Sequence, residues 1–414
     1  MGPAFFVLAD NKSHQAFDYQ YLEKSTVPTL KFQKSLLRLP VPKLEDTVTR
    51  YLSALQPIIP DEEQYANTVR IANDFKSGEG VELHSILVNE NKMNKHTSYI
   101  SKPWFDMYLS SRTPLVLNYN PFMSWKDDPD PKYMVLPVRV TNMLISALRF
   151  KRSLESQQLS PEVYHLNPKK SDTEFYRKLM KFTPEAFASL VSMAMKAFPL
   201  DMSQFASLFS GTRIPRKNRD ELVNYSKSKH IVFLKGGQFY SVDVLNESGE
   251  IKSPEELYSS VSHIVSLKVD PKMDYISPLS AENRDVWAEA RDRIVTSSSV
   301  NADSLNKVDS AIFVISLDDL SFNQDTELLD AAHNYLHGNS RKQGDKKMNR
   351  WFDKSFGMIF DQSGHASITF EHSWGDGVAV LRVFNDIYKE STKNHFVGRD
   401  TKTDSTPQVQ HLYK

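Results

Sequence analysis

A histidine stands where a pair of short strands runs into a helix, in the stretch 357–388. Two apolar runs, 357–360 and 366–370, flank the segment DQSG, a pattern that predicts strand, turn and strand. From Val378 onward, apolar residues recur at helical spacing. His372 is therefore predicted to lie on a bend between a strand and a helix, where its side chain leaves the edge of a sheet.

The motif on this bend is His372-x-x-x-Asp376-Gly377. Taken alone, the spacing favours a simple interpretation, in which the histidine ends the strand and Asp376 is the N-cap of the following helix. The functional interpretation is that His372 is a base, and that Gly375 and Gly377 let a substrate approach the backbone without meeting a Cβ atom. Glu371 precedes the histidine, so strand alternation points it to the opposite face.

The overall composition indicates a folded protein without a net charge. The chain has 414 residues, 40% of them apolar, which predicts two core-bearing units. Lys+Arg and Asp+Glu both number 51, so no net field favours nucleic acid and no nucleic-acid partner is expected. Cysteine is absent, which excludes disulfides, thiolate nucleophiles and cysteine-ligated zinc and suggests a reducing or redox-indifferent compartment. No metal site is expected at His365 and His372, because no carboxylate supports them at ligand spacing.

The start of the chain carries no readable address, and no membrane span is expected in the sequence. No apolar run is long enough to cross a bilayer. Residues 1–30 remain unassigned, since they lack the basic region of a signal peptide and the arginines of a transit peptide.

The remaining pattern predicts an α/β fold, a mixed β-sheet with surrounding helices. Helices are expected over 43–52, 61–75, 79–89, 137–153 and 282–294, and strands over 114–118, 309–317 and, as a hairpin, 230–245. The apolar stretch 182–209 is interrupted by charges and by Pro199, so it cannot span a membrane. Its residues favour buried helices, and the alternative is an interfacial segment.

Several longer segments of the chain resemble one known family. They are LPVPKLEDT at 39–47, PWFDMYL at 103–109, ENRDVWAE at 282–289, NRWFDKSF at 349–356 and FEHSWGDGVAVLR at 370–382. Over residues 25–411 the chain resembles the carnitine and choline acyltransferases, which implies a fold like that of chloramphenicol acetyltransferase.

The resemblance implies a domain organisation. Residues 98–390 correspond to the family's domain that carries the catalytic histidine, and the helices within 31–97 belong to a second domain. Residues 391–414 are expected to be a linker-like tail. Family members continue past the position of Lys414, so the second domain is expected to be incomplete here.

The resemblance also implies chemistry, with His372 as general base. The reaction would be the reversible transfer of a long-chain acyl group, such as palmitoyl, between carnitine and coenzyme A in fatty acid oxidation. Without cysteine or a Gly-x-Ser-x-Gly elbow, direct transfer is expected rather than an acyl-enzyme. Coenzyme A would be a co-substrate and no cofactor is bound permanently; no residue for binding it is predicted. Asp376, with Gly377 as support, would pair with a cation and fix the bend, and the N-cap is the alternative role.

Two further expectations follow from the resemblance. The stretch 182–209 would be an insertion that attaches the protein to a membrane surface, on the matrix side of the mitochondrial inner membrane. The alternative function is a catalytically incompetent form of the same family that acts only by binding.

Overall fold

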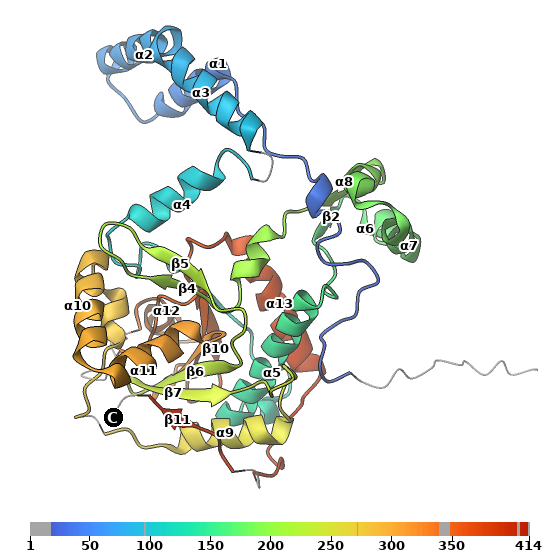
Figure 1. The fold of residues 1–414 in the computed structure, drawn as a ribbon, viewed down its shortest axis with the longest axis vertical. Coiled ribbons are helices and arrows are strands. Elements are labelled where there is room, and N and C mark those ends of the chain that lie inside the picture. Colours follow the sequence, from blue (N-terminus) through green and yellow to red (C-terminus); the bar gives the residue numbers. More distant parts are fainter. Residues whose placement is uncertain are drawn as a thin grey trace, which may run out of the picture.

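The computed structural model describes residues 18–94, 97–270, 272–323, 325–338, 348–403 and 406–412. At its centre is a seven-stranded sheet with the order β1-β10-β9-β8-β6-β7-β11 (Figure 1). Its strands are β1 (Phe122–Ser124), β6 (His230–Lys235), β7 (Gln238–Asp243), β8 (Val314–Leu317), β9 (Phe356–Phe360), β10 (Ala366–Phe370) and β11 (Gln410–His411). The β6–β8 and β8–β9 pairs are parallel and the other pairs are antiparallel, so the predicted mixed sheet is confirmed.

Helices cover both faces of this sheet. On one face lie α5 (Leu136–Glu155), α9 (Pro254–Ser266) and α13 (Gly377–Lys393); on the other lie α10 (Arg284–Ser297), α11 (Ser299–Ser310) and α12 (Leu328–His337). Strand alternation produces this division, because Ile231 and Phe233 of β6 join the core under α5, whereas Val232 and Leu234 join the core with Trp287. Short 3-10 turns connect some elements: η2 (Pro131–Tyr133), η3 (Ser203–Ser207) and η4 (Ser277–Ala281).

The hairpin predicted over 230–245 is present as β6 and β7. Gly236 and Gly237 connect these strands with φ angles of 56° and 77°. Positive φ at both positions is what a tight hairpin turn with the right twist requires, which explains the Gly-Gly pair.

The strand predicted over 114–118 is wrong. This segment is a turn, in which the Leu115 carbonyl oxygen accepts from the Tyr119 N–H at 2.7 Å and Leu117 has a φ of 66°. Turn chemistry from the following Asn and Pro residues outweighs the apolar pattern. The edge strand β1 begins only at Phe122.

The strand predicted over 309–317 is shorter than expected, since α11 continues to Ser310 and β8 begins at Val314. The tail from residue 391, expected to be linker-like, still includes the end of α13. It also includes β11, whose His411 pairs with Tyr240 of β7.

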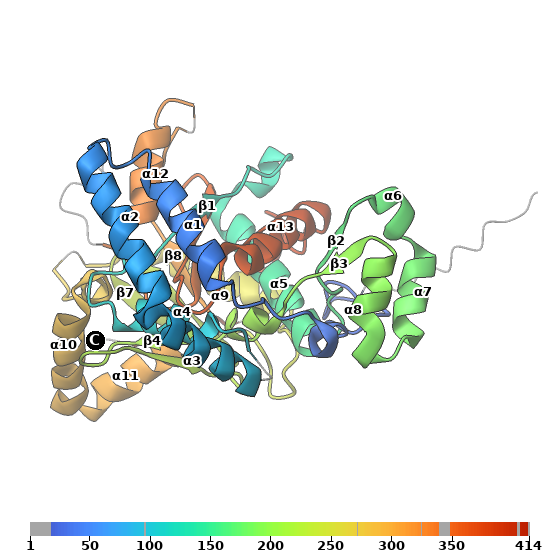
Figure 2. The same ribbon diagram turned by 90° about the horizontal axis from the view of Figure 1, so that it is seen from above.

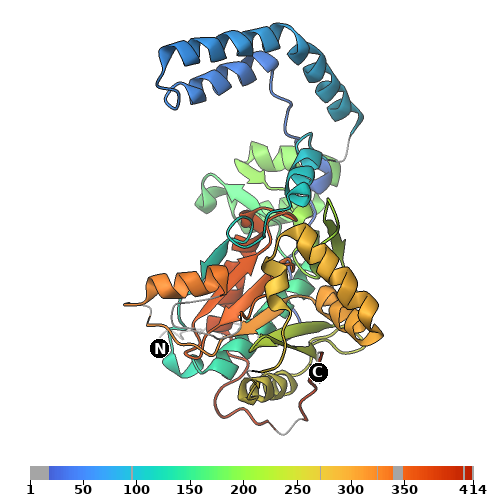
Figure 3. The same ribbon diagram turned by 90° about the vertical axis from the view of Figure 1, so that its left-hand side faces the viewer.

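The helices predicted near the start of the chain are present as α1 (Leu44–Leu55), α2 (Glu62–Ser77) and α3 (Glu79–Met93). Figures 1 and 3 show this group standing away from the sheet and its helices. The group buries few apolar side chains, among them Val48 and Ala72. Many of its larger apolar side chains are exposed, namely Tyr51, Ile58, Ile71, Phe75, Val81, Leu83, Ile86 and Met93.

A small helical layer lies to the side of the sheet opposite α10 and α11 (Figures 1 and 2). It comprises η1 (Gln33–Ser35), α6 (Pro168–Ser171), α7 (Glu174–Phe182), α8 (Glu185–Ala194) and the two-stranded pair β2 (Val163–His165) and β3 (Ala197–Pro199). Val27 and Phe32 from the N-terminal segment complete its own small core.

The stretch 182–209 therefore divides into two parts. Helix α8 leaves Phe187 and Leu190 exposed, but Phe205 and Leu208 lie in the main core. The expectation of a continuous membrane-facing insertion is wrong for the second part, because these side chains pack against the sheet layer.

Candidate active site

His372 lies on the predicted bend, between the end of β10 and the start of α13. Its backbone N–H donates to the carbonyl oxygen of Tyr119 at 3.1 Å. The side chain is partly exposed. The bend therefore holds the histidine backbone to a neighbouring loop and turns the imidazole toward the surface.

Aromatic side chains of α4 (Ser101–Ser110) surround the imidazole. The Tyr108 ring is stacked on it at 5.4 Å between centroids, and the Trp104 ring lies at 5.7 Å. The Trp104 indole Nε1–H also donates to the Ser373 carbonyl oxygen at 3.2 Å. Helix α4 thus contacts the bend both at the His372 ring and at the Ser373 backbone. Partial burial, and then the charge of Glu371, raise the pKa of Tyr108, so this phenol stays protonated.

The two ring nitrogens of His372 have different surroundings. Nδ1 is buried and makes no hydrogen bond to a described residue. Nε2 is therefore the ring nitrogen that can meet a substrate. A neutral imidazole that accepts a proton at Nε2 carries its own hydrogen on Nδ1, and no described residue accepts a hydrogen bond from that nitrogen.

Asp376 is a helix N-cap, the simpler of the two roles considered from the sequence. Its carboxylate accepts from the Val378 N–H at 2.8 Å, and its own N–H donates to Gln204 Oε1 at 3.0 Å. Among the residues that the structure describes, no cation forms a salt bridge with it. The expected cation pair is therefore not present in the described part of the chain.

The glycines of the motif differ in their surroundings. A Cβ atom on Gly375 would lie 3.2 Å from Gln204 Oε1, whereas one on Gly377 would lie 3.9 Å from the Phe370 ring. Neither glycine has a positive φ. The described residues thus leave room for a side chain at position 377, and the expected approach of a substrate to this glycine stays a prediction.

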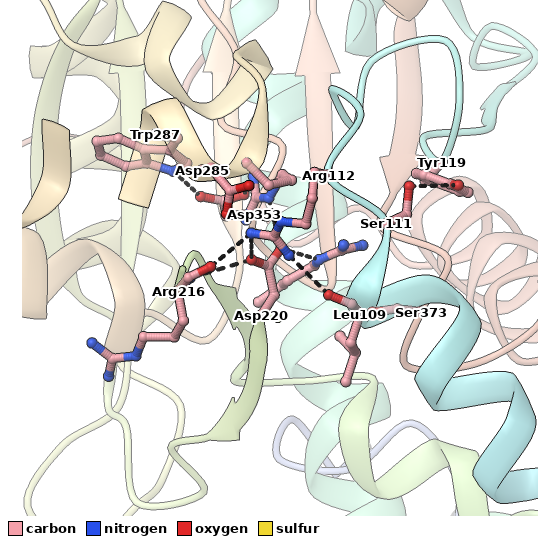
Figure 4. Close-up of polar contacts among 12 residues, drawn as sticks. Leu109, Ser111, Arg112, Tyr119, Arg216, Asp220, Asp285, Trp287, Asp353 and Ser373 are labelled. Carbon is pink, nitrogen blue, oxygen red and sulfur yellow. Dashed lines mark hydrogen bonds and ion pairs between the residues drawn. The ribbon is translucent and has the colours of Figure 1, made fainter. Parts of the chain in front are cut away.

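A buried cluster of charged side chains lies beneath the bend. Glu371 points to the opposite side from His372, as strand alternation predicts, and accepts from Arg213 Nη1 at 2.8 Å. Arg213, on β4 (Gly211–Ile214), also donates from Nε to Asp220 Oδ2 at 2.7 Å. In Figure 4, Asp220 and Asp353 lie in the same cluster, and the Trp287 indole at its edge donates to the Asp353 carboxylate.

The cluster is closed by two further arginines. Arg284 donates to Asp220 Oδ2 and to Asp353 Oδ1, both at 2.7 Å, and Arg112 donates to Asp220 Oδ1 at 2.9 Å. Burial acts to raise the pKa of Asp220, but the Arg284 and Arg213 guanidiniums outweigh it and hold this pKa below its usual range. Arg112 also pairs with Asp285, so the three arginines face four carboxylates, those of Glu371, Asp220, Asp353 and Asp285.

Several residues around His372 were not predicted from the sequence. Trp104 and Tyr108 lie four residues apart on one helix face, a spacing that could have marked them as a pair. Arg213 gave no such signal. It lies on β4, which pairs with β5 (Glu221–Asn224) in a separate two-stranded sheet, and only the fold brings it under Glu371.

A separate hollow of about 820 Å³ lies between the N-terminal segment, α7 and α13. His372 and its aromatic neighbours do not line it. Its Arg382 is paired with Glu23, Glu162 and Asp386, so this cation is not left for a ligand.

The described residues contain neither a metal-binding cluster nor a membrane-spanning helix. No group of three or more His, Cys, Asp or Glu side chains there is arranged to hold a metal ion. In the same residues, no helix is both long and apolar enough to cross a membrane.

The bend, its histidine and the mixed sheet define a class of protein that comparison with known families identifies. Residues 39–413 match the family model described as choline/carnitine O-acyltransferase. The chain belongs to this family.

Within it, the chain is 46% identical over 396 residues to "Carnitine O-palmitoyltransferase 2, mitochondrial" of Macaca fascicularis, covering 95% of this chain and 58% of that protein. It is 44% identical over 399 residues to the protein of the same name from Xenopus tropicalis, covering 96% and 59%. The chain thus spans less than two thirds of the length of these relatives. Among solved structures, a chloramphenicol acetyltransferase chain aligns over 70% of this chain and 94% of its own, at 8% identity and with a TM-score of 0.28.

Proposed function

We propose that this chain carries the general base of a carnitine O-palmitoyltransferase, and that the base is His372. The observation that carries the proposal is a partly exposed histidine on the bend, with Nδ1 enclosed, in a chain of this family. The reaction is the reversible transfer of a long-chain acyl group between carnitine and coenzyme A, with coenzyme A as co-substrate.

In the direction of acylcarnitine formation, Nε2 of His372 removes the proton from the carnitine hydroxyl as its oxygen attacks the thioester carbonyl. The tetrahedral intermediate then collapses, the C–S bond breaks, and the imidazolium returns its proton to the leaving thiolate. In the reverse direction the coenzyme A thiol is the group deprotonated. The chain has no cysteine, so one direct transfer needs fewer groups than an acyl-enzyme route.

The other motif residues support the bend in this proposal. Asp376 starts α13 directly after the bend, and the backbone at Gly377 begins the helix without a side chain. They fix where the imidazole emerges and do not act as a second base.

The test measures turnover of palmitoylcarnitine and coenzyme A by the purified chain. His372→Ala is expected to lower kcat by about 10²–10⁴-fold. His365→Ala is the matched control, because this histidine lies on the same hairpin and has its own partner, Asp361. If the chain shows no turnover above the His372→Ala level but binds coenzyme A in calorimetry, the binding-only alternative replaces the proposal.

We also propose that α7 and α8 contact a membrane surface, in keeping with a location on the matrix side of the mitochondrial inner membrane. Phe182, Phe187 and Leu190 are 79%, 59% and 55% exposed. Lys178 and Lys181 lie on the same helix as Phe182. Exposed apolar side chains beside cations are typical of interfacial contacts with anionic lipids.

Sedimentation with vesicles tests this surface. The chain is expected to bind phosphatidylcholine vesicles that contain phosphatidylglycerol, and a Phe182→Ser, Phe187→Ser, Leu190→Ser variant is expected to stay in the supernatant. Point substitutions are required, because deleting 182–209 would remove core residues such as Phe205. A triple variant that still sediments would refute the proposal.

For the domain organisation, we propose that 98–390 form the domain that carries the base and that α1–α3 belong to a second domain. The exposed apolar faces of α1–α3 support this, since such faces are normally covered by a partner surface.

A further inference from the structure

We propose that the buried Arg213–Glu371 ion pair is a positioning element that holds the His372 imidazole in its working orientation. The catalytic value of this orientation rests on the proposed function. The orientation of the His372 ring can be measured without any turnover. Three sets of contacts around the Arg213 guanidinium support this positioning.

The first set fixes the backbone on both sides of His372. The Glu371 carboxylate accepts from the Ser373 N–H at 3.0 Å and from the Ser373 hydroxyl. Its other oxygen accepts from Arg213 at 2.8 Å. Because the residues before and after His372 are attached to one carboxylate, the peptide units between them have little freedom to rotate.

The second set fixes the ring stacked on the imidazole. Arg213 Nη2 donates to the Tyr108 carbonyl oxygen at 2.7 Å. The Tyr108 ring lies parallel to the His372 ring, with an interplanar angle of 4°. One guanidinium therefore holds both the backbone from which the imidazole projects and the residue whose ring packs against it.

The third set fixes Arg213 itself. Its Nε donates to Asp220, which is held in turn by Arg284 and Arg112. The side chains of Arg213 and Asp220 are fully buried. A planar guanidinium can reach Glu371, Asp220 and the Tyr108 carbonyl at once, and a lysine ammonium in its place cannot match this geometry.

Most buried ion pairs only affect stability, so the test needs a readout of imidazole orientation. The chain is prepared with labelled histidine, and the His372 resonances are assigned by their loss in His372→Ala. Two quantities are measured on the folded protein: the imidazole chemical shifts across a pH titration, and the rate at which diethyl pyrocarbonate modifies His372, followed by peptide mass spectrometry.

Glu371→Gln and Arg213→Lys are expected to shift the His372 resonances away from the values set by the parallel Tyr108 ring and to raise the modification rate. Asp309→Asn is the matched control. It weakens another buried ion pair, with Arg291, that shares no residue with the cluster, and it should leave both quantities unchanged.

If the Glu371→Gln variant has the same His372 chemical shifts and the same modification rate as wild type, the proposal is overturned. If Glu371→Gln does not fold, Ser373→Ala decides by the same criteria, because it removes one donor to Glu371 without changing a charge. In a turnover assay, Glu371→Gln should lower kcat by about 10²-fold with little change in KM. If wild type shows no turnover, the proposed function fails, while the resonances still decide whether the ion pair positions His372.

Discussion

The ring of Tyr108 and the imidazole of His372 lie parallel, 5.4 Å apart between centroids and inclined by 4°. Their residues come from opposite ends of the folded unit's sequence, one from α4 and one from the end of β10. At this separation the two rings are offset, the arrangement that aromatic pairs favour. The orientation of the histidine thus depends on a helix distant in sequence.

Tyr108→Leu is expected to lower the turnover supported by His372, by up to about tenfold, because such a ring pair is worth roughly 0.5–1.5 kcal/mol. Tyr108→Phe keeps the ring and should stay near wild type in steady-state kinetics. Equal losses in the two variants would show that the hydroxyl, not the stack, matters.

Asp376→Ala is expected to lower the free energy of unfolding by about 1 kcal/mol, since it removes the N-cap of α13. Asp376→Asn keeps a capping oxygen and loses the charge, so it should unfold in urea like wild type. An Asn variant that is stable but loses turnover would instead favour the pairing with a cation.

Gly364→Ala is expected to destabilise the chain by roughly 2–5 kcal/mol, since backbone strain adds about 1–2 kcal/mol and overpacking about 1–3 kcal/mol. Gly364 has a φ of 82°, and a Cβ there would overlap the Met134 carbonyl oxygen. Gly249→Ala is the control, because its φ is 77° but no atom lies within 4 Å of the added Cβ. Thermal unfolding should show a loss of only about 1–2 kcal/mol for the control.

His365 is expected to make stability depend on pH. Its ring Nδ1 lies 2.8 Å from Asp361 Oδ2, and this hydrogen bond, opposed by burial, raises the pKa of His365. A raised folded-state pKa means that the contribution is fully present below the unfolded pKa of about 6.5 and is lost as the pH rises through the folded pKa.

Urea unfolding of wild type and His365→Gln can measure this contribution. The difference in stability between the two proteins should be larger near about pH 5.5 than near about pH 8.5. A difference that is the same at both pH values would contradict the assignment.

Local patterns predicted the elements that depend on neighbours in the sequence. The hairpin of β9 and β10, the bend at His372 and helix α13 were all expected, because their apolar periods and turn residues lie within one stretch. The strand predicted over 114–118 was wrong although the deciding signal is also local, because this segment is itself a turn in which the Leu115 carbonyl oxygen accepts from the Tyr119 N–H.

The surroundings of His372 could be predicted only in part. Glu371 was assigned to the correct face by alternation, but nothing near it in the sequence indicates Arg213, which lies on a separate two-stranded sheet. Buried ion pairs between distant segments depend on the complete fold, so one sequence does not identify them.

The two outermost strands of the main sheet are also its shortest, β1 with three residues and β11 with two. Short edges offer few free backbone groups to another chain, which protects against edge-to-edge aggregation. During synthesis, however, β7 emerges from the ribosome long before β11, and its six-residue outer edge then has no partner strand. A nascent chain that pauses between these two strands would present that edge to its surroundings, where open strand edges tend to pair with other chains.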